Sequence, residues 1–466
     1  LAELHMNIVK VLTNSESVLD NIACLLDLAS EVSQATTPEE KELERCEPLI
    51  LRISIPEFTP YDITSTQIVD IFNYIGKCVV AGNVRRTAEI MFGRPDDQSF
   101  SELKQDLDKL RDRRWASNNS IFAEVGMDYT KHAEMTAVNG EPGYMWLDNA
   151  RAYGRMMEPA NWKDRRAEGA NPCSEQTLES FELCCLVETF PSNHESLEDY
   201  HATLKYAYLY AKSVTLLPTH DPRTNAVMMR NRRIGCSQSG IQHNIAKIGF
   251  REHMGWCDSG YARIKGLDKK YSDWLCVPRS IKMTSVKPSG TVSLLPGVSP
   301  GVHFDHSEYY IRRIRIQKSS PIIKACQDAG HNSAPCPYQP DSIAIDFPVH
   351  VENFVKSKYD ASMWEQLELV AQIQRYWADN QVSATVTFSK EEAGQIATAL
   401  SMYETRLKSV SFLPLADHGY ELAPYETITK EEYEALSAKL TPLDLSLSSH
   451  EKEDKFCDGD SCTVEF

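Results

Sequence analysis

The most constraining feature of the sequence is a run of four chemically active side chains within fourteen residues. Asn171, Cys173 and Glu175 alternate along the chain, and Cys184 follows Cys173 by eleven residues. Radical removal of a hydroxyl needs this set: a thiol that becomes a thiyl radical, a carboxylate that takes a proton, an amide that orients a hydroxyl and a reducing thiol. A thiyl radical needs protection from water, which restricts the fold. The alternative is a buried structural cysteine beside a turn proline, because free cysteine is among the most buried residue types.

Length, charge and hydropathy restrict the class of protein. With 466 residues, 42% of them hydrophobic, the chain can bury one large α/β domain or two coupled ones. Its net charge of −17 argues against a protein that binds duplex DNA or an anionic membrane. No apolar run is long enough to span a bilayer and no leader indicates secretion, so we expect a cytoplasmic protein. The chain begins at Leu1 in the middle of a pattern, and we expect it to be the later part of a longer protein.

The thirteen cysteines are scattered and odd in number, which predicts reduced thiols rather than a disulfide framework. Because no C-x2-C pair occurs, we expect no structural zinc site, and we assign no metal ligands. Two places break the scatter, namely the neighbours Cys184 and Cys185 and the C-terminal pair Cys457 and Cys462.

Helical and strand patterns mix along the chain without a fixed repeat, which favours an α/β fold. The segment from Thr66 to Val80 places apolar side chains on one helical face: Ile68, Ile71, Phe72, Ile75 and Val79. The further predicted helices are Phe100 to Trp115 and Leu197 to Val214, and the predicted strands are Ala88 to Phe92, Ile281 to Val286 and Val382 to Phe388.

The composition changes after about residue 440. Residues 441–456 are polar and charged and predict a flexible linker, which spans at most roughly 50–58 Å when extended. The linker leads to Cys457 and Cys462, an arrangement that suits a mobile thiol shuttle. The alternative is a disordered tail whose cysteines have no role. We therefore expect a domain over residues 1–440 and a redox tail over residues 441–466.

A second motif, Lys287 to Ser293, follows the predicted strand Ile281 to Val286. Small hydroxyl residues around a glycine let backbone N–H groups approach a phosphate, and Ser289, Gly290 and Thr291 have this composition. An ordinary turn explains the same residues, because no Walker spacing is present. His303, in the glycine-rich loop that follows, is a candidate ligand contact or a solvent-exposed histidine.

These motifs together resemble the adenosylcobalamin-dependent (class II) ribonucleoside-triphosphate reductases, most closely their monomeric bacterial and phage type. Six segments occur in family order: Ile75 to Arg86, Arg114 to Ser120, Asn171 to Glu175 with Cys184, Asn231 to Gly240, Val286 to Thr291, and the C-x4-C tail. The resemblance implies a ten-stranded α/β barrel built from two five-stranded halves. A central finger loop carries the radical cysteine in this fold.

The resemblance also implies roles for individual residues. Cys173 corresponds to the thiyl-radical site that abstracts the ribose 3′-hydrogen after homolysis of the cobalamin Co–C bond. Glu175 would deprotonate the 3′-hydroxyl, Asn171 would bind the ribose and Cys184 would be one of two reducing thiols. The substrate-phosphate loop corresponds to Ser289, Gly290 and Thr291, and the tail pair Cys457 and Cys462 would pass oxidation to a thioredoxin-like reductant.

The resemblance also implies which substrate, effector and cofactor the protein binds. A ribonucleoside triphosphate is the implied substrate, a deoxynucleoside triphosphate the effector and adenosylcobalamin with its cobalt the cofactor. The residues 82–86 resemble the neighbourhood of the loop that tunes substrate choice. The complete protein would be a monomer in the cytoplasm, with no direct contact to DNA or membrane.

Several features depart from the family pattern. Ser174 stands where glycine is usual, and Cys185 stands where asparagine is common. The family's second redox cysteine and most of its effector site would precede Leu1, so we expect the chain by itself to be inactive.

Three alternatives remain at this point. A large subunit of an iron-dependent class I reductase would need an adjacent tyrosine pair near the end of the barrel, and residues 407–414 contain no tyrosine. Tyr309 and Tyr310 are adjacent but lie too near the phosphate loop to match. A non-catalytic nucleotide-binding fragment would agree with the missing first half. A cysteine hydrolase would need a histidine to activate Cys173 and would leave the tail unexplained.

Overall fold

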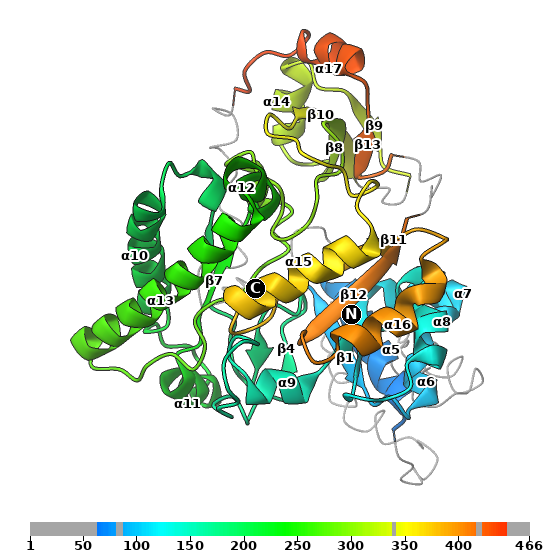
Figure 1. Ribbon diagram of the computed structural model, residues 1–466. Coiled ribbons are helices and arrows are strands. Elements are labelled where there is room, and N and C mark those ends of the chain that lie inside the picture. Colours follow the sequence, from blue (N-terminus) through cyan, green and yellow to red (C-terminus); the bar gives the residue numbers. More distant parts are fainter. Residues whose placement is uncertain (1–62, 81–86, 338–341, 416–421, 445–466) are drawn as a thin grey trace, which may run out of the picture.

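The computed structural model describes residues 63–80, 87–337, 342–415 and 422–444 (Figure 1). Helices and strands alternate throughout, which confirms the predicted α/β class. The helices are α5 (Ser65–Val80), α6 (Gln98–Ser101), α7 (Leu107–Asp112), α8 (Thr130–Asn139), α9 (Leu147–Ala152), α10 (Leu197–Val214), α11 (Pro222–Asn231), α12 (Ile241–Ile248), α13 (Phe250–Leu275), α14 (Ile322–Asp328), α15 (Met363–Tyr376), α16 (Ile396–Tyr403) and α17 (Lys430–Ser437). The strands are β1 (Glu89–Gly93), β2 (Ser117–Phe122), β3 (Gly143–Met145), β4 (Gly169–Ala170), β5 (Thr177–Leu178), β6 (Leu186–Thr189), β7 (Gly235–Gln238), β8 (Tyr309–Gln317), β9 (Ser333–Pro335), β10 (Ser342–His350), β11 (Thr385–Phe388), β12 (Ser409–Pro414) and β13 (Tyr425–Thr427).

The main sheet has the strand order β1-β2-β3-β12-β11. Strands β1, β2 and β3 run parallel to one another, and so do β12 and β11. Between these two sets, β3 and β12 pair antiparallel, with Ser409 opposite Met145. Two parallel runs that meet at one antiparallel junction are the arrangement that two fused half-barrels require.

Isolated bridges extend the second run of strands. Val382, just before β11, pairs in parallel with Val286, and Thr284 pairs in parallel with Cys236 on β7. Strand β7 then pairs in parallel with β6. The second run therefore has five members: β6, β7, residues 284–286, residues 382–388 and β12. The described residues do not include pairings that would close this path into a ring, so the ten-stranded barrel remains a prediction.

Helices α10, α13 and α15 cover this run of strands on its outside (Figure 1). Helix α10 matches the predicted bounds Leu197 to Val214, and its N-cap Ser196 accepts a hydrogen bond from the backbone N–H of Asp199. Its inner face buries Tyr200, Leu204 and Tyr208 completely. Burial of each large apolar side chain contributes roughly 1.5–3 kcal/mol, so this face attaches the helix to the strands.

Helix α5 confirms the predicted helix but not its expected packing. The apolar face is exposed, with Ile68 45% and Phe72 48% accessible, and the opposite face is buried. On that buried face, Asp70 accepts two hydrogen bonds from the guanidinium of Arg114, at 2.7 and 3.0 Å. Burial raises the pKa of Asp70, but Arg114 and Arg113 outweigh it and hold the pKa below its usual value. The helix is therefore oriented by this ion pair together with the buried Val69, which packs in the main hydrophobic core.

The predicted single helix from Phe100 to Trp115 is wrong. The segment forms the short helices α6 and α7 with 3-10 turns between and after them. Asp97 caps the start of α6, where it accepts from the backbone N–H of Phe100. Asp106 explains the break before α7, because it accepts from the backbone N–H of Lys109. Aspartate that caps a new helix competes with continuation of the previous one.

A separate small antiparallel sheet lies at the top of Figure 1, with strand order β13-β8-β10-β9 and helices α14 and α17 beside it. Its core consists of Ile323, Cys326 and Ile345. The sequence analysis did not predict this sheet as a distinct unit. Within the described part of the chain, no helix has the length and apolar character that crossing a membrane requires.

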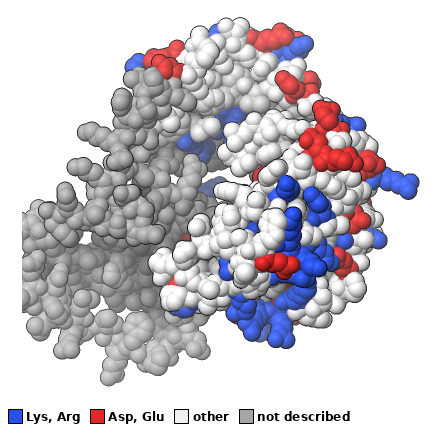
Figure 2. Space-filling model, turned by 90° about the vertical axis from the view of Figure 1, so that its left-hand side faces the viewer, with Lys and Arg blue, Asp and Glu red and all other residues white. Residues whose placement is uncertain are grey.

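Charge is distributed unevenly over the surface. Figure 2 shows Lys and Arg side chains gathered on the side of the molecule that lies at the left in Figure 1, although the net charge is −17. On α10 and α13, a hollow of about 420 Å³ is lined by the basic residues Lys205, Arg263 and Lys270. The net charge alone therefore does not describe every face of the protein.

Candidate active site

Asn171, Cys173 and Glu175 lie on a tight loop between the paired strands β4 and β5. The side chain of Asn171 accepts a hydrogen bond from the backbone N–H of Gln176 at 3.0 Å, and its backbone carbonyl accepts from the N–H of Ser174 at 2.8 Å. An asparagine that bonds its own turn in this way fixes the loop locally. We call residues 171–176 the finger loop.

Ser174 explains why glycine suits the position after the cysteine. Its φ is +60°, in the left-handed region that L-residues adopt only at a cost. The departure from the family pattern noted above is therefore a strained residue in a loop whose shape is retained.

We expect Ser174→Gly to increase the free energy of unfolding by about 0.5–1 kcal/mol. Glycine adopts the left-handed conformation without steric cost, although its greater freedom in the unfolded chain cancels part of this stabilisation. Urea denaturation measures the change. Ser401→Gly, inside α16, is the matched control and should lose about 1 kcal/mol because it replaces a residue within a helix. A loss of stability at both positions would contradict the strain argument.

Both runs of strands hold the finger loop. On one side, the amide of Asn118 on β2 donates to the carbonyl of Pro172 at 3.1 Å. On the other side, the backbone N–H of Gln381 donates to the carbonyl of Glu175 at 3.1 Å, and the hydroxyl of Ser409 on β12 donates to that of Ser174 at 3.4 Å. The loop thus crosses the space between the two runs.

The reducing thiol predicted from the sequence reaches this loop. The amide Nδ2 of Asn171 contacts the Sγ of Cys184 at 3.6 Å. The side chain of Glu175 is 2% exposed, and its Oε2 has no partner among the described residues. Asn171 thus contacts Cys184, the charge of Glu175 acts on both Cys173 and Cys184, and one carboxylate oxygen of Glu175 has no partner among the described residues.

Electrostatics favour neutral thiols here. Cys173 and Cys184 are exposed as residues, but their thiols are partly desolvated. That desolvation raises the pKa of Cys173, and the charge of Glu175 raises it further. The same two causes raise the pKa of Cys184 to about 12. Because a nucleophilic cysteine needs a lowered pKa, these thiols suit hydrogen-atom transfer rather than attack as thiolates. Burial also raises the pKa of Glu175, which brings it toward the range of a general base at neutral pH.

Cys173 lines a cavity of about 280 Å³ between the finger loop and strands β2, β11 and β12. Among the described residues that line this cavity there is no histidine, which counts against a cysteine hydrolase. Strand β12 contributes Ser409, Val410, Ser411, Phe412 and Leu413 to the lining, and Tyr144 on β3 adds a second ring. The cavity is empty space beside the thiol, so a further group can approach it.

The loop Lys287–Gly301 begins immediately after the paired residues 284–286. Ser289 is buried, has a φ of +47°, and its hydroxyl has no partner among the described residues. Lys287 has a charge that lowers the pKa values of Cys173, Cys184 and Glu175, against the stronger effect of burial. Pro288, next to Lys287, lines the same cavity as Cys173, so this loop and the finger loop lie close together. Sequence reasoning included Lys287 in the motif but assigned it no role.

A second cavity, of about 320 Å³, lies between this loop and the small sheet. It is lined by rings from both parts, including His303, His306, Tyr310, His350 and Tyr425. Burial lowers the pKa of His306 to about 4, and Lys358 contributes to the decrease. From the sequence, only His303 of this group was a candidate ligand contact, and Tyr310 was considered only as the neighbour of Tyr309.

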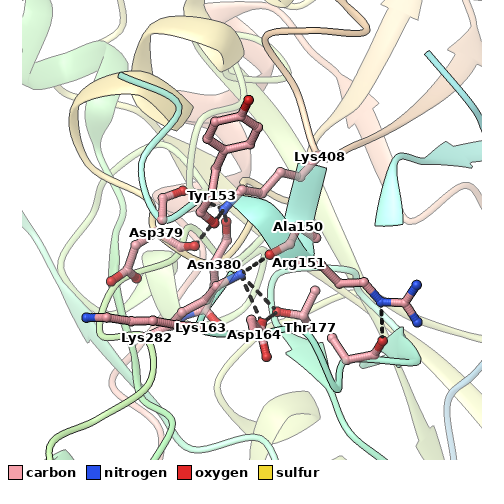
Figure 3. A network of polar contacts seen from close by, with 12 residues as sticks. Ala150, Arg151, Tyr153, Lys163, Asp164, Thr177, Lys282, Asp379, Asn380 and Lys408 are labelled. Carbon is pink, nitrogen blue, oxygen red and sulfur yellow. Dashed lines mark hydrogen bonds and ion pairs between the residues drawn. The ribbon is translucent and has the colours of Figure 1, made fainter. Parts of the chain in front are cut away.

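A buried ionic network holds the base of the finger loop (Figure 3). The carboxylate of Asp164 accepts from the guanidinium of Arg233 at 2.6 and 2.8 Å, from the hydroxyl of Thr177 at 2.7 Å, and pairs with Lys282 at 3.0 Å. Arg233 is fully buried and also pairs with Glu182 at 2.9 Å. Thr177 lies on β5, directly after the loop, so the network connects the finger loop to β7 and to residue 282.

Some predicted residues lie outside the described part of the chain, namely Cys457, Cys462 and residues 82–86. The nine described cysteines are all free thiols. Among the described residues, no group of three His, Cys, Asp or Glu side chains has an arrangement that could hold a metal ion.

Comparison with known proteins identifies the family. No family model matches the chain. An adenosylcobalamin-dependent ribonucleoside-triphosphate reductase of Euglena gracilis is 50% identical over 413 residues, and a Dictyostelium discoideum protein named "probable adenosylcobalamin-dependent ribonucleoside-triphosphate reductase" is 52% identical over 413 residues. Each alignment covers 86% of this chain and 54 to 56% of the relative, so the chain spans about half the length of these curated relatives.

A crystal structure of a B12-dependent (class II) ribonucleotide reductase superposes with a TM-score of 0.74 and 34% identity, covering 84% of this chain and 59% of that one. The chain is a homologue of the class II, adenosylcobalamin-dependent ribonucleotide reductases. The predicted family is thus confirmed. The present chain also superposes on the alpha subunit of the class Id ribonucleotide reductase of Actinobacillus ureae, with a TM-score of 0.52 and 15% identity. This second likeness shows a common fold alone.

Proposed function

We propose that this class II homologue contributes the radical-bearing part of an adenosylcobalamin-dependent ribonucleoside-triphosphate reductase. The observation that carries the proposal is the finger loop, where Asn171, Glu175 and Cys184 surround Cys173 and burial raises the pKa of both thiols. The names of the relatives support the same reaction.

In the proposed reaction, the C2′–OH of a ribonucleotide becomes C2′–H, two thiols become one disulfide and one water leaves. Cys173, as a thiyl radical, removes the 3′-hydrogen and later returns a hydrogen atom to C3′. Glu175 takes the proton of the 3′-hydroxyl through its free carboxylate oxygen. Asn171 orients the ribose, and Cys184 is one of the two reducing thiols.

The residues near Cys173 are suitable for adenosylcobalamin as the radical source. The cavity of about 280 Å³ lies beside the thiol, and its described lining residues do not include the tyrosine pair that a class I relay would require. The ring-lined cavity of about 320 Å³ provides His303, His306, Tyr310 and Tyr425 as contacts for part of a large planar cofactor. When bound, adenosylcobalamin supplies an organic radical by homolysis of its Co–C bond.

We propose that Ser289, Gly290 and Thr291 bind the substrate phosphates, with Lys287 beside them. Backbone N–H groups of a glycine-containing loop and a nearby ammonium are suited to an anion. Pro288, which precedes Ser289 in this loop, lines the same cavity as Cys173, and this placement supports the assignment.

We extend the proposal to the tail cysteines, the effector and the oligomeric state of the complete protein. Cys457 and Cys462 act as a shuttle between Cys184 and a thioredoxin-like reductant, a deoxynucleoside triphosphate acts as effector, and the complete protein works as a cytoplasmic monomer. Residues 1–440 then belong to the catalytic unit and residues 441–466 to the redox tail. A mobile thiol is what a buried pair needs to meet a protein reductant.

The test is deoxynucleotide formation from CTP and ATP by the protein of the full reading frame, with dithiothreitol and with or without adenosylcobalamin. We expect product only with the cofactor. Product that depends instead on an iron-loaded partner subunit would indicate class I. Nucleotide binding without product under both conditions would indicate a non-catalytic nucleotide-binding protein.

A further inference from the structure

The two ends of the phosphate loop lie against each other. Gly301 has a φ of +55°, and a Cβ on it would lie 2.1 Å from the carbonyl oxygen of Lys287. Any side chain at residue 301 would therefore displace Lys287. The loop Lys287–Gly301 is closed at its base, and the geometry of that base decides how Ser289, Gly290 and Thr291 are presented.

Two serines at the end of β7 bind the two ends of this loop. The hydroxyl of Ser237 accepts from the backbone N–H of Lys287 at 2.8 Å, and the hydroxyl of Ser239 accepts from that of Gly301 at 2.9 Å. A serine hydroxyl has one proton of its own to donate. The acceptor of that proton therefore fixes the orientation of each serine side chain.

Both serines donate to one carboxylate oxygen. The Oε1 of Glu188, on the adjacent strand β6, accepts from Ser239 at 2.7 Å and from Ser237 at 3.1 Å. Strand register explains the meeting, because Glu188 stands directly opposite Ser237. The other oxygen, Oε2, is buried without a partner among the described residues.

We propose that Glu188 is a positioning residue for triphosphate binding, which holds both ends of the loop Lys287–Gly301 through Ser237 and Ser239. The inference rests on the proposed function of that loop as the substrate-phosphate site. Glu188 is not one of the proposed catalytic residues near Cys173. It acts on the position of the residues in the loop Lys287–Gly301.

The charge of Glu188 is compatible with this role. A buried carboxylate behind a phosphate site would repel the ligand, but burial raises the pKa of Glu188, against the hydroxyls of Ser239, Ser289 and Ser237 and the ammonium of Lys287. A neutral carboxyl keeps Oε1 as an acceptor for both serines. Glutamine has the same acceptor and the same shape, so Glu188→Gln should retain the function that Glu188→Ala loses.

The test measures KM for CTP and kcat in the protein of the full reading frame with adenosylcobalamin. We expect Glu188→Ala to raise KM about tenfold, as loss of one buried hydrogen-bond centre implies, with little change in kcat. Glu188→Gln should stay within about twofold of the wild type, which separates the acceptor role from packing. Glu198→Ala, at an exposed position on α10, is the control without effect.

Milder variants keep the test decisive if Glu188→Ala does not fold. Ser237→Ala releases only the Lys287 end and Ser239→Ala only the Gly301 end, and each should raise KM. Unchanged KM in Glu188→Ala, or in both serine variants, would overturn the proposal. So would a fall in kcat at constant KM, because that result would assign Glu188 to the chemical step.

Hydrogen exchange separates this inference from the proposed reaction. In the 466-residue chain, the amides of Lys287 and Gly301 should exchange faster in Glu188→Ala than in Glu188→Gln. If the wild type forms no deoxynucleotide, the proposed reaction fails, while faster exchange still supports the positioning role. Equal exchange in both variants would refute that role even in an active enzyme.

Discussion

Cys173→Ser should reduce deoxynucleotide formation to the background of the assay in the protein of the full reading frame. The sulfur is the only atom of the finger loop that can hold the proposed radical, since an O–H bond is stronger than an S–H bond and serine cannot replace it. Burial raises the pKa of Cys173, so the native residue offers a hydrogen atom rather than a thiolate. The measurement is product formed from CTP with adenosylcobalamin and dithiothreitol.

The control for this prediction is Cys276→Ser. Cys276 is also a free and exposed cysteine, but it stands at the C-terminal end of α13, away from the finger loop. It should retain full activity and the same binding of CTP. Product from Cys173→Ser above background would refute the radical assignment, whereas equal loss in both variants would indicate a general sensitivity to thiol replacement.

The largest expected effect on stability is at Asp164. Its carboxylate compensates the fully buried Arg233 and the buried Lys282, and Figure 3 shows Lys282 beside it. Asp164→Ala leaves those cations without their partner and should lower the free energy of unfolding by about 3–5 kcal/mol. Urea denaturation of the chain measures the loss. Asp148→Ala removes an 85% exposed carboxylate that pairs with Arg151 at 3.6 Å, and should change stability by less than about 1 kcal/mol.

The pH dependence provides an independent check on the same residue. Burial raises the pKa of Asp164, but Lys282 and Arg233 outweigh it, so the folded-state pKa lies well below the ordinary value of about 4. The stabilisation is therefore fully present above about pH 4 and is lost as the pH falls toward the folded-state pKa. Asp164→Asn should lack this acid-dependent part of the stability. An unchanged acid profile, or a loss below about 1 kcal/mol in Asp164→Ala, would contradict the assigned role.

Local features of the site could be predicted from the sequence. Asn171, Cys173 and Glu175 lie within five residues, and the chemistry of each side chain is independent of the rest of the fold. Helix α10 was also predictable, because its apolar periodicity agrees with how it is buried. Strand β11 lies within the predicted strand, although Thr387 is buried as well as Val386 and Phe388. In these cases the information that determines the structure lies within one segment.

Helix α5 illustrates where this reasoning fails. Its apolar residues have helical spacing, and yet Ile68 and Phe72 are exposed because Asp70 pairs with Arg114 across the chain. Periodicity predicts a helix but not which face a distant cation selects. The small sheet that supplies Tyr310 and Tyr425 to the second cavity was likewise not predictable, because its strands come from separate parts of the chain.

The sequence by itself thus determined which reacting groups the protein carries and the loop that presents them. Only the tertiary structure decided what stands behind them: Asp164 meets Arg233 across 69 residues, and Glu188 meets Ser239 across 51. The second pair depends on strand register, because Glu188 on β6 stands opposite Ser237 on β7, and a shift of one residue would turn its side chain to the opposite face. The first pair joins two segments that lie outside the strands. Hydrogen bonds and buried charges act over a few ångströms in space, a distance that separation along the chain does not encode.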